Sequence, residues 1–150
     1  MAATEATNTQ LEVNKAVVRR FVVEIFGHQD LDAVDELVGE DFSPHTWGPM
    51  PPGRKPLREA MRRAAAGVSD ATFEIHQLIA EGDLVAARLT SSATHTGTFM
   101  GIPPTGRRYS IDEIHIFRLR DGQVIEHWHE FDPGALIRQL KEEGSGDPSA

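Results

Sequence analysis

The stretch from Ile111 to Asp132, IDEIHIFRLRDGQVIEHWHEFD, constrains the fold more than any other part of the chain. Two runs rich in Ile, Phe, Val and Trp flank the dipeptide Asp121-Gly122, which is typical of a tight turn. This pattern predicts a long antiparallel β-hairpin. The hairpin also carries three of the seven histidines, at strand positions where hydrophobic alternation would otherwise place plain core residues. We therefore expect the chemistry of the protein to lie on this hairpin.

The length of the turn decides which side chains share a face, because a shift of one residue turns every side chain over. A two-residue turn sends His115 and His129 to opposite faces. A three-residue loop, with Gly122 in the left-handed conformation, pairs Leu119 with Gln123. We favour this second register because it groups the ionisable residues and brings the two histidines within about 8 Å of each other. The shared face then holds Glu113, His115, Phe117, Ile125, His127, His129 and Phe131.

The first half of the chain predicts three helices. Apolar residues at helical spacing run over 11–26, a second short helix follows over 31–38, and a basic amphipathic helix covers 56–68. Residues 40–55 hold four of the nine prolines and therefore read as irregular structure. Because this segment also contains Phe, His, Trp and Met, we interpret it as a loop folded over the mouth of a cavity.

The second half predicts strands, because the apolar period changes to two after residue 70. Residues 71–82 and 84–97 form one hairpin, and a Gly/Pro-rich loop leads from it to the histidine-bearing hairpin. A closing helix over 133–143 follows, with Asp132 as its N-cap candidate. Helices followed by antiparallel strands indicate the α+β class. We expect three N-terminal helices packed on a strongly curved antiparallel sheet, with an internal pocket.

Length and composition restrict the possible functions. The 150 residues suit one domain, which we place at 11–143 between disordered tails at 1–10 and 144–150. The net charge of −8 and the pI near 5.3 argue against a nucleic-acid surface. The lack of cysteine excludes a disulfide, a thiol nucleophile and a thiolate metal site. No apolar run reaches membrane-spanning length, so we expect no membrane partner and, by default, a cytoplasmic location.

Several segments resemble the SnoaL-like polyketide cyclase (ester cyclase) family, which belongs to the NTF2-like (cystatin-like) cone folds. The resemblance extends over about residues 11–140. Its most specific pieces are GIPPTGR at 101–107 and IFRLRDGQVIEHW at 116–128. The resemblance implies an NTF2-like α+β cone, a homodimer, and a small-molecule substrate that is polyketide-like or aromatic.

The resemblance also implies a reaction, the cofactor-free intramolecular aldol condensation of a polyketide ester by a lyase- or isomerase-type enzyme. An acid/base residue removes a proton next to a carbonyl, and polar neighbours stabilise the enolate. In characterised members this residue is an aspartate on the last strand, near a conserved Trp. Family sequences often carry an acidic residue directly after that Trp and another three positions later. Here these positions hold His129 and Asp132, and either could match the catalytic aspartate.

Three residues are the catalytic candidates. His129 is the candidate base, because an imidazole titrates near neutral pH. His115 on the facing strand could donate to an enolate oxygen or hold a carboxylate. Asp132 is the alternative acid/base residue, unless it serves only as the helix N-cap. A further set is expected to contact the substrate, and two of its members, His45 and Trp47, are expected to close the cavity mouth. This set is His45, Trp47, Glu113, Phe117, His127, Phe131 and Phe42.

Two other classes of function stay open. Glu113 and four histidines, at 45, 115, 127 and 129, could supply nitrogen and oxygen ligands to zinc or ferrous iron. Because His-x-His along a strand is no recognised metal signature, we assign no metal ligand and no cofactor. The cone could also bind a small molecule without catalysing any reaction.

Overall fold

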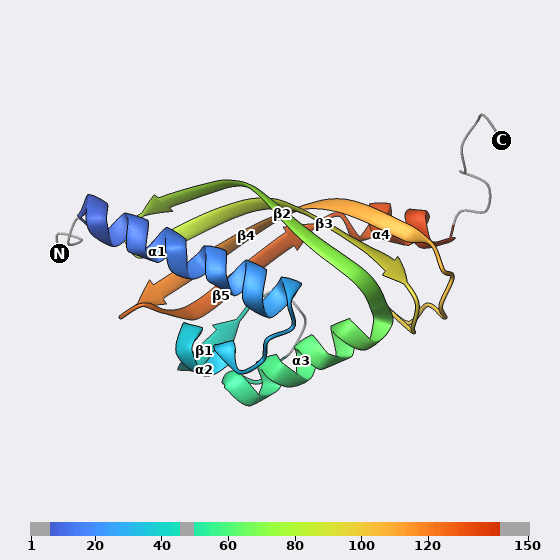
Figure 1. Cartoon of the computed structure of the whole chain (residues 1–150), viewed down its shortest axis with the longest axis horizontal. Helices are drawn as coiled ribbons and strands as arrows, with labels where there is room; N and C mark the ends of the chain where they lie inside the picture. The colour runs from blue at the N-terminus through green and yellow to red at the C-terminus, as the bar shows by residue number, and fades with distance from the viewer. Residues whose placement is uncertain (1–6, 46–49, 142–150) are drawn as a thin grey trace.

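The computed structural model describes residues 7–45 and 50–141 and confirms the α+β class. A five-stranded sheet with the order β1-β5-β4-β3-β2 curves over the helices (Figure 1). The strands are β1 Val38–Pro44, β2 Val68–Glu81, β3 Leu84–His95, β4 Arg108–Arg120 and β5 Gln123–Phe131. The helices are α1 Asn8–Arg20, η1 Phe21–Gly27, α2 Ala33–Leu37, α3 Arg54–Gly67 and α4 Pro133–Lys141. Within the described residues no helix is both long and apolar enough to cross a membrane.

The first predicted helix is present, but its winding changes midway. Its N-cap is Thr7, whose Oγ1 accepts a hydrogen bond from the Gln10 backbone at 3.1 Å. Helix α1 therefore begins at Asn8, before the predicted start and inside the segment that we expected to be a disordered tail. The last part, η1, is a π-helix, a form often found at functional sites. It places Phe26 against the cavity described below.

The segment that we predicted to be an irregular loop begins with strand β1. This strand pairs in parallel with β5, through Val38 with Val124 and Pro44 with His127. The sheet is therefore mixed, and the prediction of a wholly antiparallel sheet is wrong at this edge. Proline is compatible with the position, because an edge strand forms ladder hydrogen bonds on one side only. Phe42 of β1 is fully buried in the main core.

The histidine-bearing hairpin turns over two residues, so the predicted three-residue loop is wrong. Arg120 pairs with Gln123, and the two residues between them, Asp121 and Gly122, have φ values of 52° and 76°. Positive φ at both central positions is what a type I′ turn requires. The predicted left-handed glycine is thus confirmed, although the turn around it is shorter.

A β-bulge restores the register that the short turn would have broken. Ile125 is the extra residue, between Val124 and Glu126, which both have partners on β4. Beyond the bulge His115 pairs directly with His129. The predicted common face is therefore confirmed for six residues, with Val124 buried in place of Ile125. These six are Glu113, His115, Phe117, His127, His129 and Phe131.

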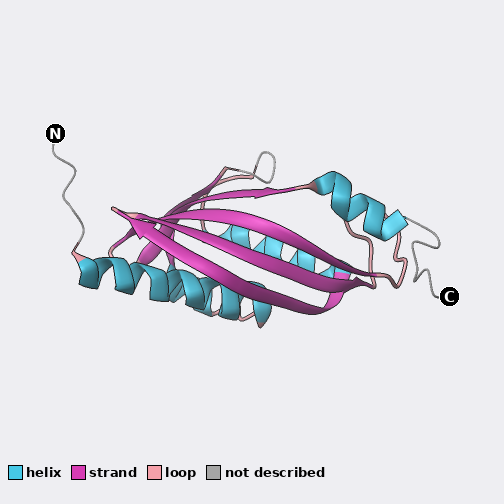
Figure 2. Cartoon of the chain, turned by 90° about the horizontal axis from the view of Figure 1, so that it is seen from above, coloured by secondary structure: helices cyan, strands magenta, loops and turns pink. Residues whose placement is uncertain are grey.

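Helix α4 closes one end of the sheet (Figure 2). Its Gln139 side chain accepts a hydrogen bond from the Ser110 backbone N–H at 2.8 Å and donates to the Ser110 carbonyl at 3.0 Å. Because β5 has ended at Phe131, this amide takes the place of a neighbouring strand along β4. Leu136 and Leu140 of α4 then pack into a second core cluster with Ala93, Tyr109 and Ile111.

Candidate active site

A cavity of about 410 Å³ lies between the concave face of the sheet and the helices, as predicted. Most of its wall is aromatic or aliphatic. The apolar lining residues are Phe26, Met61, Ala64, Ala65, Val68, Ala71, Phe73, Phe99, Met100, Ile111, Phe131 and Leu136. The polar lining residues are Gln29, Ser91, Ser92, Tyr109, Glu113, His115 and His129. An apolar cavity with a few converging polar groups is the usual form of a small-molecule site.

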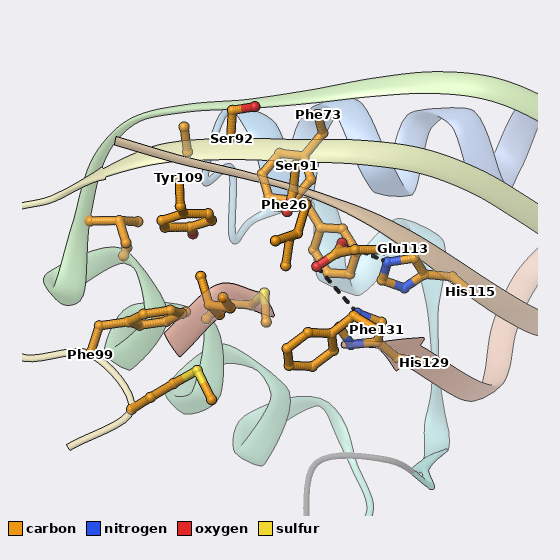
Figure 3. A pocket seen from close by; sticks show the side chains of 18 of the residues that line it. Phe26, Phe73, Ser91, Ser92, Phe99, Tyr109, Glu113, His115, His129 and Phe131 are labelled. Atoms are coloured by element: carbon orange, nitrogen blue, oxygen red, sulfur yellow. Dashed lines mark hydrogen bonds and ion pairs between the residues drawn. The ribbon is translucent and has the colours of Figure 1, made fainter. Parts of the chain in front are cut away.

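The ionisable part of the wall is a carboxylate between two imidazoles (Figure 3). Glu113 on β4 lies with Oε2 3.1 Å from His115 Nε2 and with Oε1 3.4 Å from His129 Nε2. The three side chains are each at most 8% exposed. Alternation along the two strands and the bulge in β5 bring them together, because each points to the concave face from a neighbouring position.

A second hydrogen bond extends this group into the core. His127 Nε2 and His115 Nδ1 are 2.8 Å apart. Because a neutral imidazole carries one N–H, a His115 that donates from Nε2 to Glu113 accepts at Nδ1 from His127. The His127 ring is packed against Phe21, Phe26 and Phe117 and does not line the cavity. Hydrogen bonds thus run from a fully enclosed histidine to a carboxylate at the cavity wall.

Burial and hydrogen bonding set the charge of the cluster. Burial acts to raise the pKa of Glu113, but hydrogen bonds from His115 and His129 outweigh it and lower that pKa to about 2. Burial lowers the pKa of His115, although Glu113 opposes the shift. Burial also lowers the pKa of His127 well below its ordinary value. At neutral pH the cluster therefore contains an ionised Glu113 with a neutral His115 and a neutral His127.

The same residues form a two-histidine, one-carboxylate set whose ligand atoms all lie within 4.8 Å of one another. Such a set can bind iron or zinc. However, the rings of His115 and His129 are stacked, with centroids 4.1 Å apart and planes inclined by 8°. An imidazole nitrogen binds a metal along its lone pair, at about 2.0–2.1 Å and in the ring plane. Two nearly parallel rings cannot both direct a lone pair at one point, so the arrangement fits a hydrogen-bonded acid–base cluster.

A family model described as SnoaL-like polyketide cyclase matches residues 16–140. The chain belongs to this family. Nogalonic acid methyl ester cyclase from Streptomyces nogalater is 31% identical over 132 residues, 85% of this chain and 93% of that protein. Aklanonic acid methyl ester cyclase DnrD from Streptomyces peucetius is 39% identical over 61 residues, 41% of this chain and 42% of that protein. The structure of TsrD from Streptomyces laurentii has a TM-score of 0.79 at 31% identity, with 87% of this chain and 96% of TsrD covered.

The structure separates the two positions that could match the catalytic aspartate of SnoaL-like cyclases. His129 lines the cavity and stacks on Phe131, with ring centroids 5.0 Å apart. Asp132 does not line the cavity, and its side chain is 69% exposed. Its Oδ1 accepts a hydrogen bond from the Ala135 backbone at 3.1 Å, which makes it the N-cap of α4. Of these two positions, only His129 reaches the cavity.

Other predicted contact residues lie away from the cavity. Phe42 and Phe117 are fully buried in the main core, because their strands direct them between the sheet and the helices. His45 is on the outer side of the sheet, stacked on Trp128 with centroids 4.8 Å apart and 2.8 Å from Glu126 Oε2. The prediction that His45 closes the mouth is therefore wrong. Trp47 lies outside the described residues.

Sequence reasoning missed part of the lining. Ser91, Tyr109 and Phe99 belong to the wall but were not among the predicted contacts. For Tyr109 a signal existed, because Tyr109 and Glu113 are four residues apart on one strand and must share a face. The contribution of Phe99 depends on how the loop after β3 folds back, which no local pattern in the sequence reveals.

Proposed function

We propose that this chain catalyses a cofactor-free intramolecular aldol condensation on a polyketide-like carbonyl substrate. The observation that carries the proposal is the position of the Glu113–His115–His129 cluster on the wall of an otherwise apolar cavity. Carbanion chemistry needs a base, charge stabilisation and protection from water. The cluster offers the first two, and the aromatic and aliphatic lining offers the third. The named activities of the related cyclases support the same reaction class.

In this proposal His129 is the general base. Glu113 is a weak base, because hydrogen bonds lower its pKa to about 2. His115 already uses one ring nitrogen toward Glu113 and the other toward His127. His129 lines the cavity beside the carboxylate, so a proton that it accepts creates a positive charge next to a fixed negative one. The stacked His115 ring must then stay neutral, since two imidazolium rings at 4.1 Å would repel each other.

The proposed aldol condensation needs no reagent other than the substrate and the side chain of His129. His129 removes a proton from the carbon next to a carbonyl, and the electron pair moves onto the carbonyl oxygen as an enolate. The imidazolium beside Glu113 stabilises this enolate electrostatically. The enolate carbon then attacks a second carbonyl of the same molecule and forms the new ring bond. The resulting alkoxide takes the proton back from His129, so the product is an isomer of the substrate.

The test is to incubate the purified protein with aklanonic acid methyl ester or nogalonic acid methyl ester and to measure the rate of ring closure by chromatography. We expect His129→Gln to lower the rate by about 10²–10⁴-fold, while Gln at this position keeps a polar side chain toward Glu113. Treatment with a chelator should leave the rate unchanged. Full activity in His129→Gln contradicts the proposed base, and loss of activity on chelation points to the metal alternative. Tight binding of the esters without turnover or α-proton exchange indicates a binding protein.

We also propose that two copies pair through the outer face of the sheet. Ile79, Ala86, Ile116 and Trp128 form a continuous row across β2, β3, β4 and β5. Ile79 is 63% exposed and Ile116 is 38% exposed, an arrangement that suits burial against a second copy. Sedimentation of the protein should show a dimer that Ile116→Lys converts to a monomer. A cytoplasmic location stays a prediction from the sequence.

A further inference from the structure

We infer that Ser91 and Tyr109 form an oxygen-binding subsite in the half of the cavity away from the histidines. This subsite takes a carbonyl or hydroxyl oxygen of the substrate that is remote from the reacting carbon. The inference rests on the proposed function and adds to it the residues that bind a second, distal oxygen of the polyketide-like substrate.

Both hydroxyl groups belong to buried residues of the cavity wall. Ser91 is 5% exposed and Tyr109 is 7% exposed, and both line the cavity. Figure 3 shows them projecting from β3 and β4 into the same space as Glu113. Both oxygens are open to the cavity, so a ligand oxygen that enters it can accept a hydrogen bond from either hydroxyl.

Tyr109 is a hydrogen-bond donor at every pH at which the protein is expected to work. Burial, followed by the negative charge of Glu113, raises the pKa of Tyr109 to about 12. The phenol therefore keeps its proton and cannot serve as a base. Its ring lies parallel to that of Phe99, with an interplanar angle of 4°, so the hydroxyl is presented from an aromatic wall. A flat ligand fits this part of the cavity, because its faces meet rings and its oxygen meets the phenol.

The register fixes how far the subsite lies from the reactive wall. Tyr109 and Glu113 are four residues apart on β4, about 13 Å of backbone at 3.3–3.4 Å per residue. Ser91 pairs with Ile111, the residue midway between them. Tyr109, Ser91 and Glu113 therefore follow one another along the sheet side of the cavity, with the acid–base cluster at one end. A one-ring ketoester reaches only the cluster, whereas a multi-ring polyketide with a distal oxygen reaches all three.

The experiment compares 9-fluorenone with fluorene, two flat tricyclic molecules of similar shape of which only the first carries a carbonyl. Dissociation constants are measured by calorimetry for the wild-type protein, Tyr109→Phe, Ser91→Ala and the double variant. The matched control is Thr90→Val, which removes a hydroxyl on the outer face of β3 that bonds to Asp112. The preference for fluorenone should fall roughly 3- to 10-fold in Tyr109→Phe or Ser91→Ala and vanish in the double variant. Fluorene affinity should change less than about twofold, and the control should behave as wild type.

An unchanged preference in the variants overturns the inference, and so does an equal weakening of both ligands, which reports only a change of cavity shape. If the double variant does not fold, the two single variants decide by the same criteria. Neither probe carries a group that can cyclise, so the result is independent of turnover. A protein that discriminates the two ligands but never closes a ring contradicts the proposed function and leaves the subsite in place.

Discussion

His115 and His129 face each other across β4 and β5 with their ring centroids 4.1 Å apart and their planes inclined by 8°. This pair exists because the two-residue turn is followed by a bulge at Ile125. Without that extra residue, His129 would point to the outer face, away from Glu113. Because two stacked imidazolium rings would repel each other, only one of the two histidines can carry a positive charge at a time. The Glu113 carboxylate, 3.1 Å from His115 Nε2 and 3.4 Å from His129 Nε2, balances that charge.

Glu113→Gln should remove most of the activity while the protein stays folded. The amide keeps the shape of the side chain but cannot balance the imidazolium that forms on His129, so the rate should fall at least about 10²-fold. The matched control is Glu130→Gln, on the exposed face of β5, which should retain full activity. Single-turnover rates of ring closure measure the effect, and similar losses in both variants would mean that Glu113 has no special role.

Acid should destabilise the protein through its buried neutral histidines. The pKa values of His115 and His127 are lowered by burial in the folded state, so the unfolded chain binds protons first as pH falls below about 6.5. The free energy of unfolding is therefore highest above that pH and decreases toward pH 5, by up to about 1.4 kcal/mol per pH unit for each histidine. The lowered pKa of Glu113 adds a further loss only below about pH 4.5.

His127→Phe tests this origin of the acid sensitivity. The variant lacks one titrating group, so the slope of the unfolding free energy against pH between 6.5 and 5 should fall by up to about 1.4 kcal/mol per pH unit. It should still fold, because Phe suits the surrounding aromatic cluster of Phe21, Phe26 and Phe117. The control is His28→Phe, since His28 is exposed at the end of η1, and its slope should equal that of the wild type. Denaturant titrations at several pH values give the slopes. A wild-type slope in His127→Phe would place the sensitivity elsewhere.

Thr105→Val should loosen the loop that brings Phe99 and Met100 to the cavity. His95 is fully buried, with Nδ1 2.9 Å from Thr105 Oγ1 and Nε2 3.1 Å from the Ile102 carbonyl. Valine has the shape of threonine but leaves the ring nitrogen without its partner, at a cost of about 1–3 kcal/mol. Thermal unfolding should show a lower Tm, and KM should rise. Thr105→Ser, which keeps the hydroxyl, should stay near wild type; equal effects of both substitutions would exclude this bond as the cause.

The sequence predicted the shared face of the histidine-bearing hairpin correctly, but for an incorrect reason. The expected three-residue turn placed His115 and His129 on one face, and the structure confirms the grouping. The turn chemistry of Asp-Gly, however, gives the two-residue turn, and the bulge supplies the missing residue. A bulge has no strong local signature, because any residue can be the extra one where packing and pairing allow it. The resulting order of pairs depends on the whole strand.

The limits of sequence reasoning are clearest at β1 and the cavity wall. The prolines in residues 40–55 led us to predict irregular structure where β1 lies, yet an edge strand tolerates proline. The conformation of β1 is decided by its pairing with β5, which is distant in the sequence. His45 was expected inside because it is near other bulky residues, but it lies on the outer face and stacks on Trp128. The cavity itself is built from α3, the loop after β3 and α4. Their relative positions come from long-range packing, which local periodicity does not contain.

Substitutions of Asp132 can distinguish a structural role of this residue from a catalytic one. The carboxylate caps α4 through the Ala135 backbone N–H and does not line the cavity. Asp132→Ala should therefore lower the stability of the protein by about 0.5–2 kcal/mol, and Asp132→Asn should lower it much less, since asparagine also caps helices well. Ring closure by the folded variants should stay within a few-fold of wild type. A loss of about 10²-fold or more in Asp132→Asn, at unchanged stability, would instead identify Asp132 as the base and leave His129 as its neighbour.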